Sequence, residues 1–363
     1  MSVLHVHSGN LYGGVESMLT AMARLDATQK FALCFDGRLG EELRSAGCEV
    51  ISLGSVRVRQ PFSILRARRR LAEAIAKVRP TAVLCHSAWS QALFGGVVKA
   101  AGAAVVFWQH DIISGKHWLQ RAARRVRPDL AISNSRHCAK TLPALYPDTR
   151  VEVVYCPVAP RVADPEWSRE QIRRECSTAS GAVVLFQASR LEEWKGHTLL
   201  FDALTRLRTL PGWVMWLAGG AQRPHEAAYL ARLQAQVEQA GIADRVRFLG
   251  QRSDVPRLLH ASDVFCQPNT APEPFGVAMI EALQASVPVV ATAMGGPVEV
   301  LDESCGVLAA PGDADALAAA LKRLIVDPAE RARLSANGPE RARELCDPRN
   351  QMQKLLEAVE SIA

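Results

Sequence analysis

Two glutamates eight residues apart stand in the most informative stretch of this chain, residues 272–283, which reads Pro-Glu-Pro-Phe-Gly-Val-Ala-Met-Ile-Glu-Ala-Leu. Prolines on both sides of Glu273 disfavour helix and predict a loop there. From Gly276 onward the apolar residues recur with helical spacing, so this segment predicts a helix that carries Glu281.

Such a stretch could bind a ligand that has hydroxyls at both ends and phosphate in the middle. The first N–H groups of a helix are unpaired and lie at the positive end of its dipole, so they attract phosphate. Glu281 would lie about 7 Å further along the helix axis, at ~1.5 Å per residue. Glu273 before the anion site and Glu281 beyond it would each meet hydroxyls, and a nucleotide-sugar has this layout.

A second candidate is the loop at residues 189–196, which follows an apolar stretch at 183–187. Arg190 offers a fork to phosphate oxygens and Lys195 a compact charge. Together they could neutralise a leaving diphosphate in a place where other enzymes use a metal ion. The alternative is an exposed charged loop.

Two glycine pairs each stand between a predicted strand and a predicted helix. Gly13-Gly14 and Gly295-Gly296 would allow close backbone approach to an anion, and Pro297 suits a first helical turn. Neither is a G-x-G-x-x-G dinucleotide fingerprint. An ordinary tight turn is the alternative at both places.

His110 follows a very apolar strand and could hydrogen-bond a substrate hydroxyl, although local packing would also explain it. The other eight histidines show no pattern that indicates a role. Asp313 and Asp315 superficially resemble a metal-binding pair, but they precede an Ala-rich helix at 316–324, so we interpret them as helix caps.

The elements that must position these residues alternate between short apolar strands and amphipathic helices, which predicts an α/β fold with parallel sheets. A proline-rich segment at 155–167 predicts an interdomain linker. Two doubly wound domains would face a central cleft at the carboxyl ends of their strands. The expected strands are 3–7, 31–35, 49–53, 82–85, 104–109, 130–133 and 151–154, then 183–187, 213–218, 246–249, 264–267 and 287–291.

Composition indicates a globular protein with no apolar run long enough to span a membrane. Nine cysteines without a C-x-x-C pair argue against a zinc site or a disulfide framework, and the N-terminus lacks a signal-peptide pattern. We therefore expect a cytoplasmic protein.

Positive charge gathers in the first half of the chain. Residues 1–165 hold 22 Lys and Arg against 12 Asp and Glu. The basic residues are concentrated in predicted helices within 57–79 and 116–127. A solvated helix face, attraction to an anionic membrane or lipid-phosphate acceptor, and nucleic acid are the three interpretations. Nucleic acid is the weakest because no binding motif accompanies the charge.

Taken together, these motifs resemble those of the retaining glycosyltransferases of family 4, which have the two-Rossmann GT-B fold. Residues 273–283 match the family's E-x7-E motif, and S-R-L-x-x-W-K-G-H at 189–197 matches its Arg/Lys phosphate pair. Weaker matches follow in the expected order: G-G-V-E at 13–16, Q-H-D at 109–111 and I-S-N-S at 132–135.

The resemblance implies a role for each matching residue. Glu273 and His110 would meet the donor sugar, near the backbone of Phe275 and Gly276. Arg190 and Lys195 would stabilise the leaving diphosphate, which would also meet Gly14 and the N–H groups of Val277 and Ala278. Glu281 would bind the ribose hydroxyls.

The resemblance also implies domain roles and chemistry. Residues 1–160 would bind the acceptor and 165–344 the donor, with a last helix at 345–363 packing back on the first domain. A sugar would pass with retained configuration from a UDP- or GDP-sugar to a glycan or lipid-linked hydroxyl, in cell-surface polysaccharide or glycolipid synthesis. Neither a metal nor a cofactor is expected, and the basic first domain suggests a peripheral place on the inner membrane face.

Two alternatives remain open on the sequence alone. One is a nucleotide-sugar epimerase of the same fold, which would not be expected to have this Glu273/Glu281 setting. The other is a non-catalytic protein that binds nucleotide-sugars or polyanions without turnover.

Overall fold

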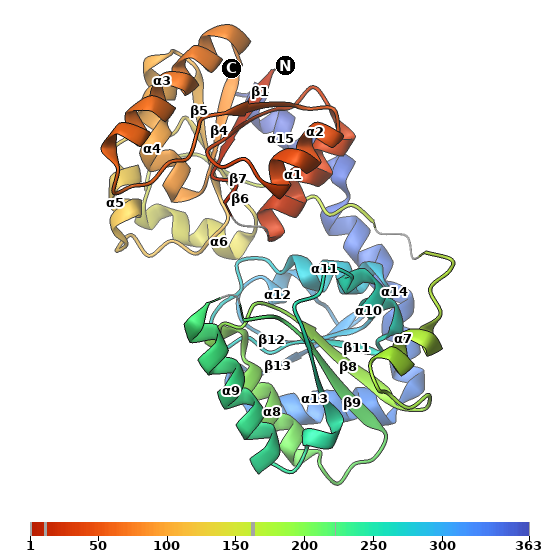
Figure 1. Cartoon of the computed structure of the whole chain (residues 1–363). Coiled ribbons are helices and arrows are strands. Elements are labelled where there is room, and N and C mark those ends of the chain that lie inside the picture. The colour runs from red at the N-terminus through yellow and green to blue at the C-terminus, as the bar shows by residue number, and fades with distance from the viewer. Residues whose placement is uncertain (1, 11–12, 161–163, 222, 363) are drawn as a thin grey trace. The chain divides into compact units, whose positions relative to one another are not determined.

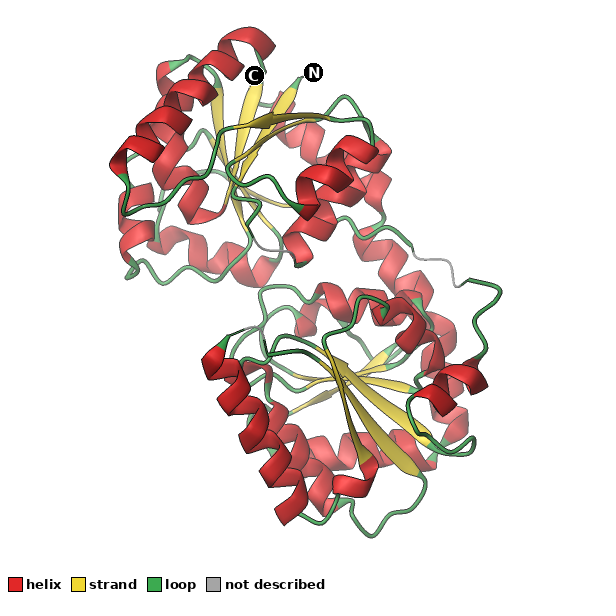
Figure 2. Ribbon diagram, in the orientation of Figure 1, coloured by secondary structure: helices red, strands yellow, loops and turns green. Residues whose placement is uncertain are grey.

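The computed structural model describes residues 2–10, 13–160, 164–221 and 223–362. The chain divides into two compact units, Met1–Ala159 with Cys346–Ala363, and Pro160–Leu345. This boundary falls inside the proline-rich segment at 155–167, of which residues 161–163 lie outside the described residues. In each unit helices cover both faces of a parallel sheet (Figure 2).

The first unit is built on a seven-stranded parallel sheet of order β3-β2-β1-β4-β5-β6-β7. The strand order reverses between β1 and β4, so the loops after these two strands diverge at that point, where ligands of such sheets bind. The strands are β1 (Val3–His7), β2 (Lys30–Leu33), β3 (Glu49–Ser52), β4 (Ala82–His86), β5 (Ala104–Gln109), β6 (Leu130–Ser133) and β7 (Val151–Val153).

Helices α3, α4 and α5 lie on one side of this sheet, and α1, α2 and α15 lie on the other (Figure 1). The terminal helix α15 starts at Pro348, where Asp347 caps it by accepting a hydrogen bond from Asn350 N. The bounds are α1 (Gly14–Leu25), α2 (Arg38–Ser45), α3 (Pro61–Val78), α4 (Ser87–Ala100), α5 (Trp118–Ala123), α6 (Arg136–Thr141) and α15 (Pro348–Glu360).

The second unit is built on a six-stranded parallel sheet of order β10-β9-β8-β11-β12-β13, with its reversal between β8 and β11. Strand β9 is buried at every position, as parallel strands covered on both faces should be. The strands are β8 (Val183–Ala188), β9 (Trp213–Ala218), β10 (Val246–Gly250), β11 (Val264–Gln267), β12 (Val289–Thr292) and β13 (Gly306–Ala309). The edge strand β13 was not among the strands expected from the sequence.

The helices of the second unit include α13, whose start explains the aspartate pair at its N-terminus. Asp313 accepts hydrogen bonds from Asp315 N and Ala316 N, and Asp315 pairs with Arg206, so the capping interpretation is confirmed. The bounds are α7 (Arg169–Glu175), α8 (His197–Arg206), α9 (Pro224–Gln239), α10 (Val255–Ala261), α11 (Val277–Gln284), α12 (Pro297–Val300), α13 (Ala314–Val326) and α14 (Pro328–Cys346).

All nine cysteines are buried, and none of them takes part in a disulfide bond. Burial raises the pKa of the Cys85 and Cys156 thiols to about 12, so both behave as small apolar side chains. Among the described helices none combines the length and the apolar composition needed to cross a bilayer.

Candidate functional site

Glu273 is the centre of a polar cluster in the second unit. Its Oε2 accepts hydrogen bonds from Lys195 Nζ, Gln267 Nε2 and Asn269 Nδ2, each at 2.7 Å. The Lys195 and Glu273 side chains are only 13% and 11% exposed. Three donors on one oxygen, with the Lys195 ammonium among them, hold this carboxylate in one orientation.

The fold brings the two halves of the cluster together from neighbouring strands. Lys195 lies in the loop after β8, and Gln267 and Asn269 lie at the end of β11, on the two sides of the reversal in strand order. The loops touch through their backbones, since Thr270 N donates to Trp194 O at 2.8 Å. A Cβ at Gly196 would lie 1.7 Å from Pro268 O, so only glycine permits this approach.

Gly295 and Gly296 support the Glu273 loop from the end of β12. Gly296 N donates to Glu273 O at 2.7 Å, and a Cβ on Gly295, which has φ +82°, would lie 2.4 Å from the same oxygen. The helix that follows, α12, has four residues. These glycines therefore allow the close backbone contact that supports the Glu273 loop, and the anion-binding helix start stays a prediction.

The predicted helix after the Phe-Gly pair forms as α11. Gly276 caps it with φ +106°, and the first internal bonds of the helix run from Met279 N and Ile280 N to Gly276 O. The N–H groups of Val277 and Ala278 precede those bonds, as the first donors of any helix do. Phe275 is buried, and Glu281 is half-buried further along the same helix.

The two cations of the loop after β8 face different carboxylates. Lys195 reaches Glu273 and also lies 3.9 Å from the centroid of the Trp194 ring. Arg190 is 63% exposed and pairs with Glu192 at 3.0 Å. The structure therefore places Lys195 in the Glu273 cluster and leaves Arg190 at its margin.

In the first unit, the predicted residues Gly14 and His110 lie at the carboxyl edge of the sheet. Gly14 opens α1, and the capping carboxylate Glu16 accepts from Gly13 N at 2.9 Å and pairs with His7 Nε2 at 2.8 Å. His110 is 6% exposed, and its Nε2 lies 2.9 Å from His86 Nδ1. Burial lowers the pKa of His110 to about 3, so this ring is neutral at pH 7.

Sequence reasoning missed four polar residues of these two edges. Gln267 and His86 are each the last residue of an otherwise apolar strand, and His7 ends β1, which also contains His5. Asn269 follows two residues after β11. A polar residue that ends an apolar parallel strand is the signal that could have found three of them. Among the described residues, no group of three or more His, Cys, Asp or Glu side chains is placed to hold a metal ion.

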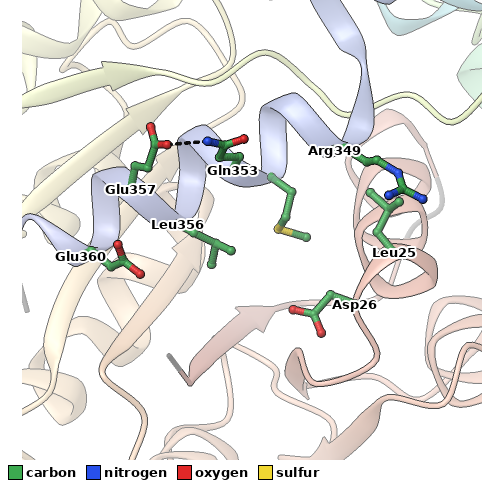
Figure 3. Close-up of a pocket in the computed structure, with 8 residues that line it drawn as sticks. Leu25, Asp26, Arg349, Gln353, Leu356, Glu357 and Glu360 are labelled. Atoms are coloured by element: carbon green, nitrogen blue, oxygen red, sulfur yellow. Dashed lines mark hydrogen bonds between the residues drawn. The ribbon is translucent and has the colours of Figure 1, made fainter.

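A cavity of about 510 Å³ lies elsewhere in the first unit, between the end of α1 and helix α15 (Figure 3). Leu25 and Asp26 line it from one side, and Arg349 and Leu356 line it from α15. None of the residues predicted to bind a ligand lies in it.

Two doubly wound parallel α/β units, each with a polar cluster at the carboxyl edge where its strand order reverses, are the architecture that the GT-B fold requires. Residues 168–341 match the family model "Glycosyl transferases group 1", and residues 12–162 match "Glycosyltransferase Family 4". The chain belongs to this family of glycosyltransferases, as the resemblance implied.

Known relatives support the same assignment. The lipopolysaccharide core biosynthesis glycosyltransferase LpsE of Rhizobium meliloti is 31% identical over 199 residues, which cover 50% of this chain and 56% of that protein. The lipopolysaccharide core biosynthesis mannosyltransferase LpsB of the same organism is 35% identical over 153 residues, covering 41% and 43%. The chain thus spans about half the length of these curated relatives.

A solved structure covers the whole fold. The crystal structure of Anabaena HepE in complex with UDP superimposes with a TM-score of 0.87 at 25% sequence identity, and it covers 99% of this chain and 100% of its own. The same protein has also been crystallised with UDP-glucose.

Proposed function

We propose that this chain is a retaining glycosyltransferase that moves a sugar from a UDP- or GDP-sugar to a hydroxyl of a glycan or lipid-linked acceptor. The single observation that carries the proposal is the fixed carboxylate of Glu273, held by Lys195, Gln267 and Asn269 where the strand order of the second unit reverses. The names of the relatives support lipopolysaccharide or other cell-surface glycan synthesis as the setting.

In this proposal the Glu273 cluster binds the donor sugar. A carboxylate accepts hydrogen bonds, and sugar hydroxyls can donate them. One oxygen of Glu273 is held by three protein donors, so the carboxylate is preorganised before the sugar arrives and loses little entropy on binding. His110 of the first unit is a second sugar contact.

The diphosphate would meet a concentration of positive charge next to this cluster. The N–H groups of Val277 and Ala278 supply the start of α11, and Lys195 and Arg190 supply full charges. Arg190 is exposed, and its ion pair is with its neighbour Glu192 on the surface, so it can turn toward a ligand at little cost. Gly14 contributes backbone from the first unit, and Glu281 binds the ribose.

Bond cleavage would then depend on charge stabilisation of the leaving diphosphate. As the bond from the anomeric carbon to the diphosphate oxygen breaks, negative charge grows on that oxygen, and fixed cations and N–H groups stabilise it. The leaving diphosphate takes the proton of the incoming hydroxyl on the same face of the sugar. This route needs neither a bound metal nor a cofactor.

A turnover assay with a nucleotide-sugar panel tests the proposal. Purified protein is incubated with UDP- and GDP-sugars and a glycan or lipid-linked acceptor, with and without excess chelator, and the released nucleotide and the anomeric configuration of the product are measured. We expect metal-independent release with retention. Glu273→Gln should lose turnover, whereas Glu303→Gln, at an exposed carboxylate of the same unit, should not.

Other outcomes would change the assignment. Binding of a nucleotide-sugar without turnover would favour the non-catalytic alternative, and conversion of the donor sugar without acceptor would favour an epimerase. A strict requirement for Mg²⁺ or Mn²⁺, or a product of inverted configuration, would contradict the proposed mechanism.

The acceptor side of the proposal includes a peripheral place on the inner face of the membrane. Phe62 and Leu65 of α3 are 80% and 59% exposed, and Arg66 and Arg69 complete the same helical stripe. Trp118, at the start of α5, is 49% exposed among further basic residues. A solvated helix face does not need exposed Phe, Leu and Trp, whereas an anionic membrane surface binds basic and apolar groups together.

A further inference from the structure

Four buried side chains form one unbroken line of hydrogen bonds in the first unit. Gln29 Oε1 lies 2.9 Å from His5 Nε2, His5 Nδ1 lies 2.9 Å from His86 Nε2, and His86 Nδ1 lies 2.9 Å from His110 Nε2. All four side chains are at least nine-tenths buried. We call Gln29, His5, His86 and His110 the histidine line.

The strand register explains why the line exists. His5 is paired with Phe31 in β2 and with Leu84 in β4, and Gln29 and His86 lie two residues before and two residues after those partners. His86 is paired with Trp108 in β5, and His110 again lies two residues further on. Residues two apart on a strand share a face, so the line runs diagonally across one face of four adjacent strands.

The imidazole rings of the histidine line are oriented so that each can hydrogen-bond to the next within its own ring plane. The planes of His5 and His86 differ by 17°, and those of His86 and His110 by 9°. An imidazole donates and accepts only in its ring plane, so near-parallel planes allow each N–H to point at the next nitrogen.

The direction of the protons is fixed at the far end by Asp26. Gln29 Nε2 donates to Asp26 Oδ2 at 2.8 Å. Burial opposes ionisation of Asp26, but hydrogen bonds from Thr28 and Gln29 outweigh it and lower its pKa, so the carboxylate only accepts. The amide nitrogen of Gln29 must therefore face Asp26, and its oxygen must face His5.

One orientation of Gln29 then sets every ring. Burial lowers the pKa of His5 to about 4 and of His110 to about 3, and it also lowers the pKa of His86, so all three rings are neutral with one N–H each. His5 must donate from Nε2 to the Gln29 oxygen and accept at Nδ1. His86 and His110 must follow the same pattern.

The line ends on an acceptor without a partner. His110 Nδ1 is buried and has no hydrogen-bond partner among the described residues. We propose that Asp26, Gln29, His5 and His86 are positioning residues that hold His110 in its Nε2–H form, so that His110 Nδ1 accepts a hydrogen bond from a hydroxyl of the bound sugar. The identity of that hydroxyl group rests on the proposed function, whereas the tautomer of His110 does not.

The tautomer can be read in the ligand-free protein, independently of activity. In ¹⁵N-histidine-labelled protein, long-range ¹H–¹⁵N correlations show which ring nitrogen carries the proton, and the loss of one ring pattern in His110→Asn assigns His110. We expect a single Nε2–H pattern in the wild-type protein. A proton on Nδ1, or a mixture of the two forms, would overturn the proposal.

Variants distinguish the effect of losing a hydrogen-bond acceptor in the histidine line from the effect of altered packing. His86→Phe keeps an aromatic ring but removes the nitrogen that accepts from His110, so His110 should lose its single Nε2–H pattern. Gln29→Met should have the same effect on His110, although Gln29 is three hydrogen bonds away along the line. His86→Asn replaces Nδ1 with an oxygen and should restore it. Gln91→Leu changes another buried polar residue of this unit, and it should cost stability without altering the pattern.

Donor turnover is the second measurement, and it tests the role of His110 in sugar binding. With a donor that the wild-type protein uses, His86→Phe should lower kcat/KM by about 2- to 10-fold, the value of one hydrogen bond, and His86→Asn should recover it. A changed tautomer with unchanged kcat/KM would overturn the role in sugar binding. If the wild-type protein turned over no donor, the proposed function would fail while the tautomer result would still decide the positioning role.

Discussion

At the scale of single residues, the cluster around Glu273 makes a direct energetic prediction. Lys195→Met and Glu273→Gln each leave the other partner of a largely buried ion pair unmatched, and each should lower the free energy of unfolding by about 3 kcal/mol. The double variant should lose at least about 1 kcal/mol less than the sum of the single losses. Urea unfolding of the four proteins measures this coupling, and additive losses would show that the pair does not interact.

The histidine line makes a prediction about pH. Folding lowers the pKa of His5 to about 4 and that of His110 to about 3. Below pH 6.5 these two rings are therefore protonated in the unfolded chain but still neutral in the folded unit. Their stabilising contribution is complete above about pH 6.5 and declines toward pH 4, by up to about 1.4 kcal/mol per pH unit for each ring. Urea unfolding at pH 7.0, 6.0 and 5.0 should show the decline, and His110→Gln should make it shallower. An equal slope in both proteins would contradict this assignment.

Local motifs single out the candidate residues, but they do not identify the side chains that contact them. Glu273, Glu281 and Lys195 stand in motifs whose spacing is local, so the sequence alone is enough to name them as candidates. Gln267, at the end of β11, and Asn269, just after it, contact Glu273 through the conformation of the chain between them, which the motifs do not specify. The histidine line depends on strand order and register, which no local pattern contains.

At the scale of elements, the Glu273 loop depends on a glycine of the neighbouring loop. Gly295→Ala would meet both an unfavourable φ of +82° and a backbone oxygen 2.4 Å from the new Cβ, whereas Gly312→Ala has a φ of +71° with open space around it. Each should lose about 1 kcal/mol of stability from backbone strain, and Gly295→Ala should lose more because the Glu273 backbone must shift. Only Gly295→Ala should also lower donor turnover, by about tenfold or more, since it displaces Glu273.

Thermal unfolding and donor turnover of the two glycine variants measure these two effects. Equal turnover in both would mean that the Glu273 loop tolerates displacement.

Most elements could be predicted because strongly apolar parallel strands alternate with helices along the chain. The starts of α13 and α15 follow from capping aspartates. Strand β13 was harder to predict because two of its four residues, Gly306 and Ala309, are of types that are uncommon in strands.

At the scale of the whole molecule, the basic and apolar surface of α3 predicts binding to anionic membranes. Phe62→Ser with Leu65→Ser should weaken binding to vesicles of acidic lipids by about tenfold or more, since two apolar side chains no longer enter the bilayer. Sedimentation with vesicles of acidic or of neutral lipid, at low and high salt, measures the effect. Val326→Ser removes an exposed apolar side chain from the second unit and is the matched control.

If the α3 double variant still sediments with acidic vesicles, the basic surface of α3 is a solvated helix face and not a membrane-binding surface. Loss of binding in both α3 and Val326 variants would indicate nonspecific adsorption rather than a defined surface.

The carboxyl edge of the second unit should bind the nucleotide diphosphate of a sugar donor. Calorimetric titration of UDP and of GDP into the wild-type protein and into Glu281→Ala measures this binding. We expect one nucleotide to bind the wild-type protein and Glu281→Ala to bind it about 10- to 100-fold more weakly, since a charged acceptor for the ribose hydroxyls is lost. No binding of either nucleotide, or equal affinity in both proteins, would contradict the account.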